Sequence, residues 1–315
     1  MRRRQAGRRV PPAPVSPMPK PQGPSPPGCA IPVSVIRATA EGLSAREDAV
    51  AAEEPLEIQL GYERKDGVRV NRSVSVTMRT PGDDADLAAG FLFGEGLVRD
   101  HSQIEAIGPA TGASVPGKGA NTIRVSLAGG VEVDLGSLER HFYTTSSCGV
   151  CGKTSIEALR IAQRFQICAD EPVFELDCLL RMPDALREAQ TVFEQTGGLH
   201  GAALFDAAGR LVLVREDVGR HNAVDKVIGA QFLAGRTPLS GTALAVSGRA
   251  SFELMQKALM AGIPVLVAVG APSSLAVDLA RRFGATLAGF VRNGRMNIYS
   301  GAHRLRQART APARS

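Results

Sequence analysis

The sequence predicts an α/β protein, in which a three-layer mixed-sheet domain follows a smaller β-rich N-terminal unit. Two patterns predict this fold class. In the second half of the chain, short continuous apolar strands alternate with helical repeats, which is typical of a largely parallel, buried sheet. In the first half, apolar and polar residues alternate along paired segments, which favours hairpins. The 315 residues are 44% hydrophobic and include no Trp, so we expect an aliphatic core.

The β-rich unit is expected over residues 45–140 and begins with a hairpin. Segments 56–63 and 68–78 alternate in polarity on either side of Asp66-Gly67. Asp-Gly favours the tight turn of a β-hairpin, because both of its residues tolerate a positive φ.

A helix and a second hairpin complete the β-rich unit. Asp83 and Asp84 suit an N-terminal helix cap, and the apolar residues after them recur at helical spacing. Segments 121–127 and 131–136 alternate in polarity around two glycines, so we expect these two segments to pair with each other.

The α/β domain is expected over residues 156–303, after a loop over 141–155 that contains two cysteines. The helical and apolar patterns in this region are short and regularly spaced. In chain order they predict a helix over 183–195, a hairpin over 201–217, a helix over 219–234, a strand over 242–248, a helix over 251–261, a strand over 264–270, a helix over 273–283 and a hairpin over 286–300 that turns on Asn293-Gly294.

The net charge of +6 belongs to the two ends of the chain. Residues 1–28 carry +6 and residues 304–315 carry +4, which leaves −4 for the rest. A core that binds nucleic acid normally carries its basic excess on the folded face, so we expect no nucleic-acid partner. Nine prolines in residues 1–28 predict a disordered Arg/Pro-rich tail over 1–30, and residues 304–315 are expected to form a basic C-terminal tail.

Targeting signals are weak in this sequence. The arginine pairs near the N-terminus suggest a twin-arginine export signal, but no apolar segment follows them. No run of about 18 apolar residues is present to span a membrane. We therefore expect a cytoplasmic protein with no membrane partner.

The stretch SSCGVCGKTS, residues 146–155, is the strongest candidate for chemistry, and four interpretations of it are open. It ends like a phosphate-binding loop, but Ser147 stands where that motif requires its first glycine. A zinc site needs four ligands, and no second cysteine pair of matching spacing exists.

The third interpretation of this stretch is thiol chemistry. Cys151 can stabilise the thiolate of Cys148, Gly149 and Gly152 let a large partner approach either sulfur, and Lys153 adds a positive charge. These features fit a nucleophilic cysteine that attacks another sulfur atom. The fourth interpretation is a flexible loop whose cysteines have no chemical role.

The other three cysteines predict no further chemistry. An odd total of five cysteines without an export signal argues against a disulfide framework. Cys29 lies in the N-terminal tail, and the apolar neighbours of Cys168 and Cys178 predict that both are packing residues.

Two turns between strands and helices suggest an anion site. One contains Ser247, Gly248 and Arg249, and the other contains Ser273 and Ser274. Each follows an apolar strand and opens a helix, where free backbone N–H groups bind phosphates in α/β folds. We therefore expect these residues to bind a ligand.

The hairpin turn on Asn293-Gly294 would place Arg292 directly opposite Arg295. Like charges facing each other are destabilising, and an anion between the two guanidinium groups would relieve this repulsion. The alternative is that both side chains point apart into solvent.

The segment REDVGRHNAVDKVIG, residues 215–229, is dense in polar groups. His221 and Asp225 lie four residues apart on a predicted helix, so the carboxylate can hold the imidazole in one tautomer. This pair suits acid–base chemistry, and it equally suits a buried structural network or a helix cap.

Several long motifs together resemble the FdhD family of formate dehydrogenase accessory sulfurtransferases. They occur in the order of the family and cover about residues 45–303. The motifs are MRTPGDDADLAAGFLFGEGL, SSCGVCG, GGLHGAALF, REDVGRHNAVDKVIG, SGRASFELMQKALMAGIPVLVAVGAPSSLAVDLA and GFVRNGRMNIYS.

This resemblance implies a fold, a function and partners. Members of the family accept sulfur from a cysteine desulfurase as a cysteine persulfide. They pass it to the molybdenum cofactor, Mo-bis(molybdopterin guanine dinucleotide), as a bound substrate, before the cofactor enters the formate dehydrogenase apoenzyme. The larger domain of the family is similar to cytidine deaminases without their zinc chemistry, so no zinc is expected, and the family forms homodimers.

The resemblance also implies site residues. Cys148 corresponds to the persulfide cysteine of the family, and Cys151 to its companion. The alternative is a chaperone that binds the molybdenum cofactor without transferring sulfur. The stretch that corresponds to a cofactor-binding segment of the family consists of Phe290, Val291, Arg292, Asn293, Gly294 and Arg295.

Overall fold

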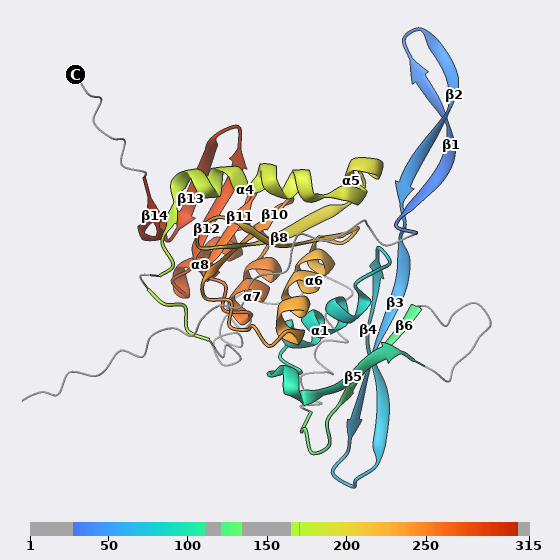
Figure 1. Cartoon of the computed structure of the whole chain (residues 1–315), viewed down its shortest axis with the longest axis vertical. Helices are drawn as coiled ribbons and strands as arrows, with labels where there is room; N and C mark the ends of the chain where they lie inside the picture. The colour runs from blue at the N-terminus through green and yellow to red at the C-terminus, as the bar shows by residue number, and fades with distance from the viewer. Residues whose placement is uncertain (1–27, 111–120, 134–164, 170, 308–315) are drawn as a thin grey trace, which may run out of the picture.

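The computed structural model describes residues 28–110, 121–133, 165–169 and 171–307. Cys148 and Cys151, with the whole predicted loop over 141–155, lie outside the described residues. The described chain contains a six-stranded and a four-stranded sheet with helices packed between and around them (Figure 1). A search of the described helices finds none that is both long and apolar enough to cross a membrane.

The six-stranded sheet has the order β13-β12-β11-β10-β8-β9. The neighbouring strands β10, β11 and β12 are parallel, and the remaining pairings, which include that of the inner strand β8 with β10, are antiparallel. The predicted mixed sheet and its two edge hairpins are confirmed, but the sheet is not largely parallel, because both hairpins and the pairing of β8 with β10 are antiparallel. The strands are β8 (His200–Asp206), β9 (Leu211–Asp217), β10 (Thr242–Val246), β11 (Val265–Ala268), β12 (Thr286–Arg292) and β13 (Arg295–Ser300).

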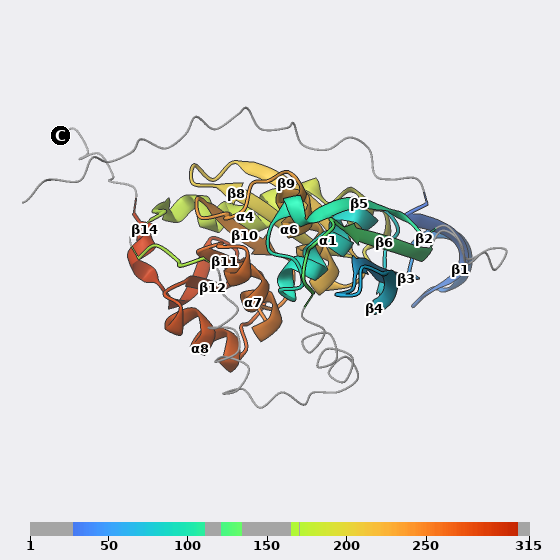
Figure 2. The same ribbon diagram turned by 90° about the horizontal axis from the view of Figure 1, so that it is seen from below.

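Helices cover both faces of this sheet, which confirms the three-layer fold class. Ala203 and Phe205 of β8 pack in a cluster with α4, whereas Ala202 and Leu204 pack with α6, α7 and α8. Figure 2 shows α4 on one side of the sheet and α7 and α8 on the other. The helices are α4 (Leu176–Ala189), α6 (Arg220–Leu233), α7 (Phe252–Met260) and α8 (Ser274–Arg282).

The four-stranded sheet has the order β4-β3-β6-β5. The first predicted hairpin is confirmed, since β3 pairs antiparallel with β4. The second is wrong, because β6 lies between β3 and β5, and residues 131–133 form no strand. This inner position buries the apolar side of β6. The strands are β3 (Glu54–Glu63), β4 (Arg69–Arg79), β5 (Ile104–Pro109) and β6 (Thr122–Leu127).

Helix α1 (Asp84–Gly94) joins the two sheets by packing along α6. A Cβ added at Gly90 would lie 1.9 Å from the carbonyl oxygen of Asp225, and one at Gly229 would lie 1.8 Å from that of Asp86. The two helix backbones therefore touch through these glycines. One hydrophobic core continues from the four-stranded sheet through α1 to the helices of the larger sheet.

The predicted cap of α1 is only partly confirmed. Asp83 takes the N-cap position, but with a φ of 55° its side chain makes no cap hydrogen bond. Its carboxylate instead lies 3.3 Å from the guanidinium of Arg215, and Asp84 lies 3.0 Å from Arg79. Both acids are thus used in ion pairs to neighbouring strands.

The helix predicted over 183–195 is two helices. α4 begins earlier, at Leu176, because Leu179 and Met182 extend the apolar face that packs on the sheet. The helix ends at Ala189, because the next residue, Gln190, has a ψ of 85°, which is not helical, and its side chain packs against Gly201. α5 (Thr191–Thr196) follows.

The remaining predictions for the α/β domain agree with the structure to within a few residues. They comprise the hairpin β8–β9, the alternation from α6 to α8, and the hairpin β12–β13. Asn293 and Gly294 have φ values of 53° and 67°, as a tight hairpin turn requires.

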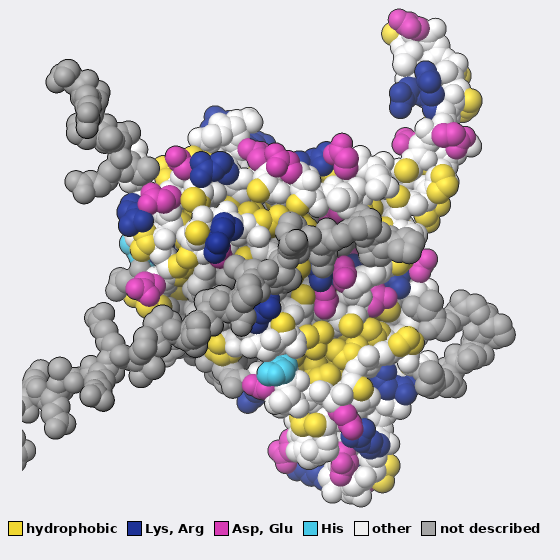
Figure 3. Space-filling view, in the orientation of Figure 1, with side chains coloured by type: hydrophobic (Ala, Val, Ile, Leu, Met, Phe, Trp, Pro, Cys, Tyr) yellow, Lys and Arg dark blue, Asp and Glu magenta, His cyan; other side chains and the backbone are white. Residues whose placement is uncertain are grey.

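An N-terminal hairpin of β1 (Ala30–Thr39) and β2 (Gly42–Ala51) was not predicted. It projects from the body of the molecule (Figure 1), and Figure 3 shows hydrophobic side chains exposed along it. Ile36 is 64% and Leu43 77% exposed. Because neither face near the tip is buried, the sequence there carries no regular alternation of polarity.

The first residues of the predicted basic tail over 304–315 belong to the folded part of the protein. β14 (Leu305–Arg306) pairs with β7 (Phe174–Glu175), and Arg304 is fully buried. The Arg304 guanidinium donates to the carbonyl oxygens of Gly284 and Cys168 and so holds three distant segments together. Two short 3-10 helices are η1 (His101–Gln103) and η3 (Ala302–Arg304).

Candidate functional site

The predicted ligand-binding turns meet at one edge of the six-stranded sheet. The carboxyl ends of β10, β11 and β12 lie there, and β8 begins there because it runs antiparallel to β10. The Gly270 amide donates to the Gly248 carbonyl at 3.0 Å, and the Ser273 amide donates to Ala250 at 2.9 Å. The turns 247–251 and 270–274 therefore lie side by side, as the anion-site prediction requires.

The serine hydroxyls at this edge support the backbone. The hydroxyl of Ser247 accepts from the Gly201 amide at 2.9 Å, and that of Ser273 accepts from the Ala276 amide at 3.2 Å. Ser273 thus caps α8. Arg249 and Ser274 are exposed, so their side chains are accessible to a ligand.

The segment Phe290–Arg295 reaches the same edge. Phe290 has a positive φ of 54°, which is unusual for a bulky residue, and its amide donates to the Gly270 carbonyl at 3.0 Å. The pairing of β12 with β13 is irregular here. This bulge joins the third strand end to the two turns.

Within that segment the residues differ in exposure. Arg292 and Arg295 face each other across the hairpin as predicted, and both are exposed, like Asn293 and Gly294. The Arg292 guanidinium lies 5.8 Å from the centre of the Phe290 ring. Val291 is fully buried in the core under α4, so only its backbone could contact a ligand.

Sequence reasoning missed two residues at this edge, His200 and Arg220. His200 begins β8, and its ring lies beside Gly248, since a Cβ there would be 3.5 Å from Nδ1. Arg220 begins α6. Burial, Arg220 and His221, in that order, lower the pKa of His200. The motif GGLHGAALF contains His200, but only the strand order shows that His200 meets the turn after β10.

His221 lies near Ser251 and Glu253, and this geometry is not that of a catalytic triad. Its Nε2 is 3.5 Å from the Ser251 hydroxyl and 3.8 Å from the Glu253 carboxylate. A triad uses both ring nitrogens, one for the nucleophile and one for the acid. Here both contacts involve the same nitrogen. The hydrogen bond with His221 is the main cause that lowers the pKa of Glu253 to about 2.

The predicted pairing of His221 with Asp225 does not form. Asp225 is buried and accepts hydrogen bonds from Lys257 at 2.7 and 2.9 Å. Burial alone would lower the pKa of Lys257, but the carboxylates of Asp225 and Glu95 raise it overall. Asp225 therefore belongs to a structural network, one of the alternatives open for the polar segment 215–229.

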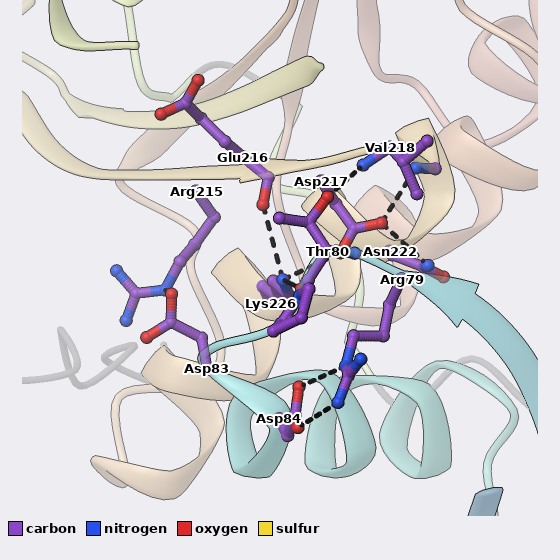
Figure 4. A network of polar contacts seen from close by, with 12 residues as sticks. Arg79, Thr80, Asp83, Asp84, Arg215, Glu216, Asp217, Val218, Asn222 and Lys226 are labelled. Carbon is purple, nitrogen blue, oxygen red and sulfur yellow. Dashed lines mark hydrogen bonds and ion pairs between the residues drawn. The ribbon is translucent and has the colours of Figure 1, made fainter. Parts of the chain in front are cut away.

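Other polar residues of that segment join the two sheets (Figure 4). Asp217 is fully buried and lies 2.8 Å from the ammonium group of Lys226. The Asp217 carboxylate accepts hydrogen bonds from Asn222 at 2.9 Å and from the Thr80 amide at 3.2 Å. Lys226 donates to the Thr80 carbonyl at 2.9 Å. These contacts connect the end of β4 to β9 and α6.

The described cysteines differ from their predictions. Cys29 is buried rather than part of a free tail, and burial is the main cause that raises the pKa of its thiol. Cys168 is exposed, so its predicted role in packing is wrong, and Cys178 is half-buried. In the part of the chain that the structure describes, no three side chains of His, Cys, Asp or Glu form a group able to hold a metal ion.

Comparisons with known proteins support the resemblance seen in the sequence. A sulfur carrier protein FdhD from Streptomyces avermitilis is 53% identical over 273 residues, which cover 86% of this chain and 94% of that protein. A sulfur carrier protein FdhD from Mycobacterium tuberculosis is 51% identical over 276 residues, which cover 85% of this chain and 95% of that protein.

A solved structure agrees with the fold. The crystal structure of a chain from Desulfotalea psychrophila, described as a formate dehydrogenase accessory protein, matches with a TM-score of 0.65 and 27% identity. The match covers 88% of this chain and 100% of the other. The model of the FdhD/NarQ family matches residues 51–306. The chain belongs to the FdhD/NarQ family.

Proposed function

We propose that this protein is a sulfur carrier that takes sulfur from a cysteine desulfurase and gives it to the molybdenum cofactor of formate dehydrogenase. The observation that carries the proposal is the identity of about one half, over nearly their whole length, with proteins named sulfur carrier FdhD. The CxxC pair of Cys148 and Cys151 supplies the required thiol chemistry.

The first step is a transfer between two cysteines. The Cys148 thiolate attacks the terminal sulfur of the desulfurase persulfide. The sulfur–sulfur bond of the donor breaks, a bond from Cys148 to the transferred sulfur forms, and the desulfurase leaves as a thiolate. No external oxidant or reductant is needed, because the sulfur keeps its oxidation state.

The second step delivers the sulfur, and Cys151 has two candidate roles in it. In one, the Cys151 thiolate attacks the inner sulfur of the Cys148 persulfide, which forms a disulfide and releases hydrosulfide to the cofactor. A cellular dithiol then reduces the disulfide. In the other, Cys151 only lowers the pKa of Cys148, and a cellular thiol attacks the inner sulfur of the persulfide instead; a mixed disulfide with Cys148 forms, hydrosulfide leaves, and a second thiol reduces the mixed disulfide.

The cofactor is the substrate in this proposal, and the edge of the six-stranded sheet would hold it. Mo-bis(molybdopterin guanine dinucleotide) carries phosphates, and the turns with Ser247, Gly248 and Arg249 and with Ser273 and Ser274 lead into the starts of α7 and α8, which favour anions. The amides of Ser247 and Ser273 already donate to the carbonyls of Gly201 and Ala250, so the exposed side chains of Arg249 and Ser274 would make the contacts. The segment Phe290–Arg295 adds two exposed guanidinium groups and an aromatic ring. The protein would act in the cytoplasm as a homodimer.

Mass spectrometry tests the proposal directly. The protein is incubated with a cysteine desulfurase and cysteine, and the peptide with Cys148 and Cys151 is examined for one extra sulfur. We expect an adduct that a reducing thiol removes, that persists in Cys151→Ala and that is absent in Cys148→Ala. An unmodified peptide in the wild-type protein would contradict the proposal.

A chaperone without sulfur transfer is the alternative function. Cys148→Ala distinguishes the two, when it is compared with wild type for cofactor binding and for activation of formate dehydrogenase. A sulfur carrier would bind the cofactor but leave the enzyme inactive. A chaperone would retain both properties.

A further inference from the structure

Three side chains outside the predicted site gather at the same sheet edge. His200 lies at the start of β8 against Gly248, and Arg220 and His221 lie at the start of α6. His221 also reaches the turn before α7, through Ser251 at 3.5 Å. The cluster therefore borders the turn between β10 and α7 that is proposed to hold the cofactor.

The charges around His200 are mainly positive. Arg220 and His221 act on its ring from α6, and only Asp217 of β9 opposes them among the groups that shift its pKa. Asp217 lies 2.8 Å from the ammonium of Lys226, so its negative charge is already compensated. Arg249, in the turn after β10, is exposed and carries a further positive charge.

Arg220 has an unused donor at this place. Its Nε atom is buried and has no hydrogen-bond partner among the described residues. A buried donor without a partner costs free energy unless a ligand supplies the acceptor. The nearby carboxylate of Glu253 is on α7, 3.8 Å from His221, and its side chain is 58% exposed. Glu253 is paired with His221, so the groups left to meet an anion are the guanidinium of Arg220 and the ring of His200.

We propose that His200, Arg220 and His221 form a diphosphate-recognition subsite in which His200 takes up a proton as the anion binds. This inference rests on the proposed function, since the guanine dinucleotide cofactor carries such a diphosphate. In the free protein burial, and after it the neighbouring charge of Arg220, lower the pKa of His200 and favour its neutral imidazole. A bound diphosphate reverses that balance, and the proton comes from solvent. When the anion leaves, the proton leaves with it, so affinity falls as pH rises.

Calorimetry with inorganic pyrophosphate tests the subsite in the full chain. Wild type is compared with His200→Gln at pH 6.0, 7.0 and 8.0, and at each pH in two buffers of different ionisation enthalpy. Pyrophosphate itself titrates in this range, so the difference between the two proteins isolates the proton taken up by His200. His101→Gln is the matched control, because His101 is exposed on η1, away from this edge.

The affinity of both proteins for pyrophosphate is compared between pH 8.0 and pH 6.0. We expect the increase for wild type to be roughly tenfold larger than the increase for His200→Gln. Arg220→Gln should weaken binding at every pH and, because Arg220 lowers the pKa of His200, should move the pH dependence to higher pH. Proton NMR gives a second measurement: the His200 ring signals, identified by their loss in His200→Gln, should titrate at higher pH with pyrophosphate present.

The result that overturns the inference is an equal pH dependence in wild type and His200→Gln, or a His200 titration that pyrophosphate does not move. Absence of pyrophosphate binding to wild type also overturns it. Formation of the Cys148 persulfide in His200→Gln separates this inference from the proposed function. If the variant forms the persulfide normally but binding is unchanged, only the subsite is wrong. If pyrophosphate binds as expected and no persulfide forms, only the sulfur-carrier proposal fails.

Discussion

At the scale of single residues, titration and reactivity follow from the groups that the fold places nearby. Glu253 lies at an exposed helix start, yet its pKa is about 2 because His221 and Ser251 hydrogen-bond to it. Cys29 lies near the chain end, yet its thiol is buried and donates to the Pro81 carbonyl at 3.2 Å. The main partner of Glu253 is 32 residues away in the sequence and the Pro81 carbonyl is 52 residues from Cys29, so neither contact follows from local sequence.

We expect Glu253 to contribute stability that is lost in acid. Its folded pKa of about 2 lies below the ordinary value of 4.5, so the contribution is present above pH 4.5 and declines as the pH falls toward 2. Urea unfolding of wild type and Glu253→Gln between pH 2 and pH 7 measures the difference. A constant difference between the two proteins over this range would exclude the proposed linkage.

Alkylation should distinguish the described cysteines. Because the pKa of Cys29 is raised and its side chain is buried, we expect iodoacetamide at neutral pH to modify exposed Cys168 first. Cys29 should react at a comparable rate only after denaturation. Peptide mass spectrometry over time measures both rates, and early labelling of Cys29 would contradict its burial.

At the scale of elements, backbone contact between α1 and α6 decides how the two sheets are joined. Glycine in a helix interior lowers the stability of the helix. Gly90 and Gly229 are nevertheless required, because only a residue without a Cβ lets the backbones of α1 and α6 come this close. Propensity alone would have favoured alanine at both positions. The sequence predicts both helices correctly but does not show that they touch through these residues.

Gly90→Ala should therefore destabilise the protein by about 3 kcal/mol or more, since the new methyl group would meet the backbone of Asp225. Gly108→Ala is the control, because a Cβ at Gly108 in β5 has nothing within 4 Å. Chemical denaturation compares both variants with wild type. Similar stabilities for the two variants would show that α1 can move away from α6 at little cost.

At the scale of the whole molecule, a buried polar network holds the two sheets together. Asp217 and Lys226 lie under the junction of β4, β9 and α6, and Arg79 and Arg215 add ion pairs at its margin (Figure 4). A buried charge without its partner is costly, so each member of the pair depends on the other.

Lys226→Met should lower the free energy of unfolding by about 3–5 kcal/mol, because it leaves the Asp217 carboxylate buried without its counter-ion. The matched control is Arg210→Ala, which removes an ion pair to Asp206 whose arginine is 77% exposed. We expect that control to change stability by less than about 1 kcal/mol. Urea denaturation of both variants measures the contrast, and equal effects would contradict the structural role of the buried pair.

The sequence by itself determined the local elements of the α/β domain and the membership of a family. Runs of apolar residues, helical spacing and turn dipeptides such as Asn293-Gly294 are local, so they predict the strands, turns and most helices of this domain; the helix predicted over 183–195 is the exception, since it is two helices. It also singled out Cys148 and Cys151, whose chemistry stays a prediction because they lie outside the described residues.

Tertiary structure alone decided which distant residues meet. β6 pairs with β3 and β5 rather than with its neighbour in sequence, and His200 reaches Gly248 only because β8 runs antiparallel to β10. Asp225 of α6 faces Lys257 instead of His221, because α7 packs against α6. Strand order and helix packing depend on the burial of surfaces from the whole chain, and no local pattern of residues contains that information.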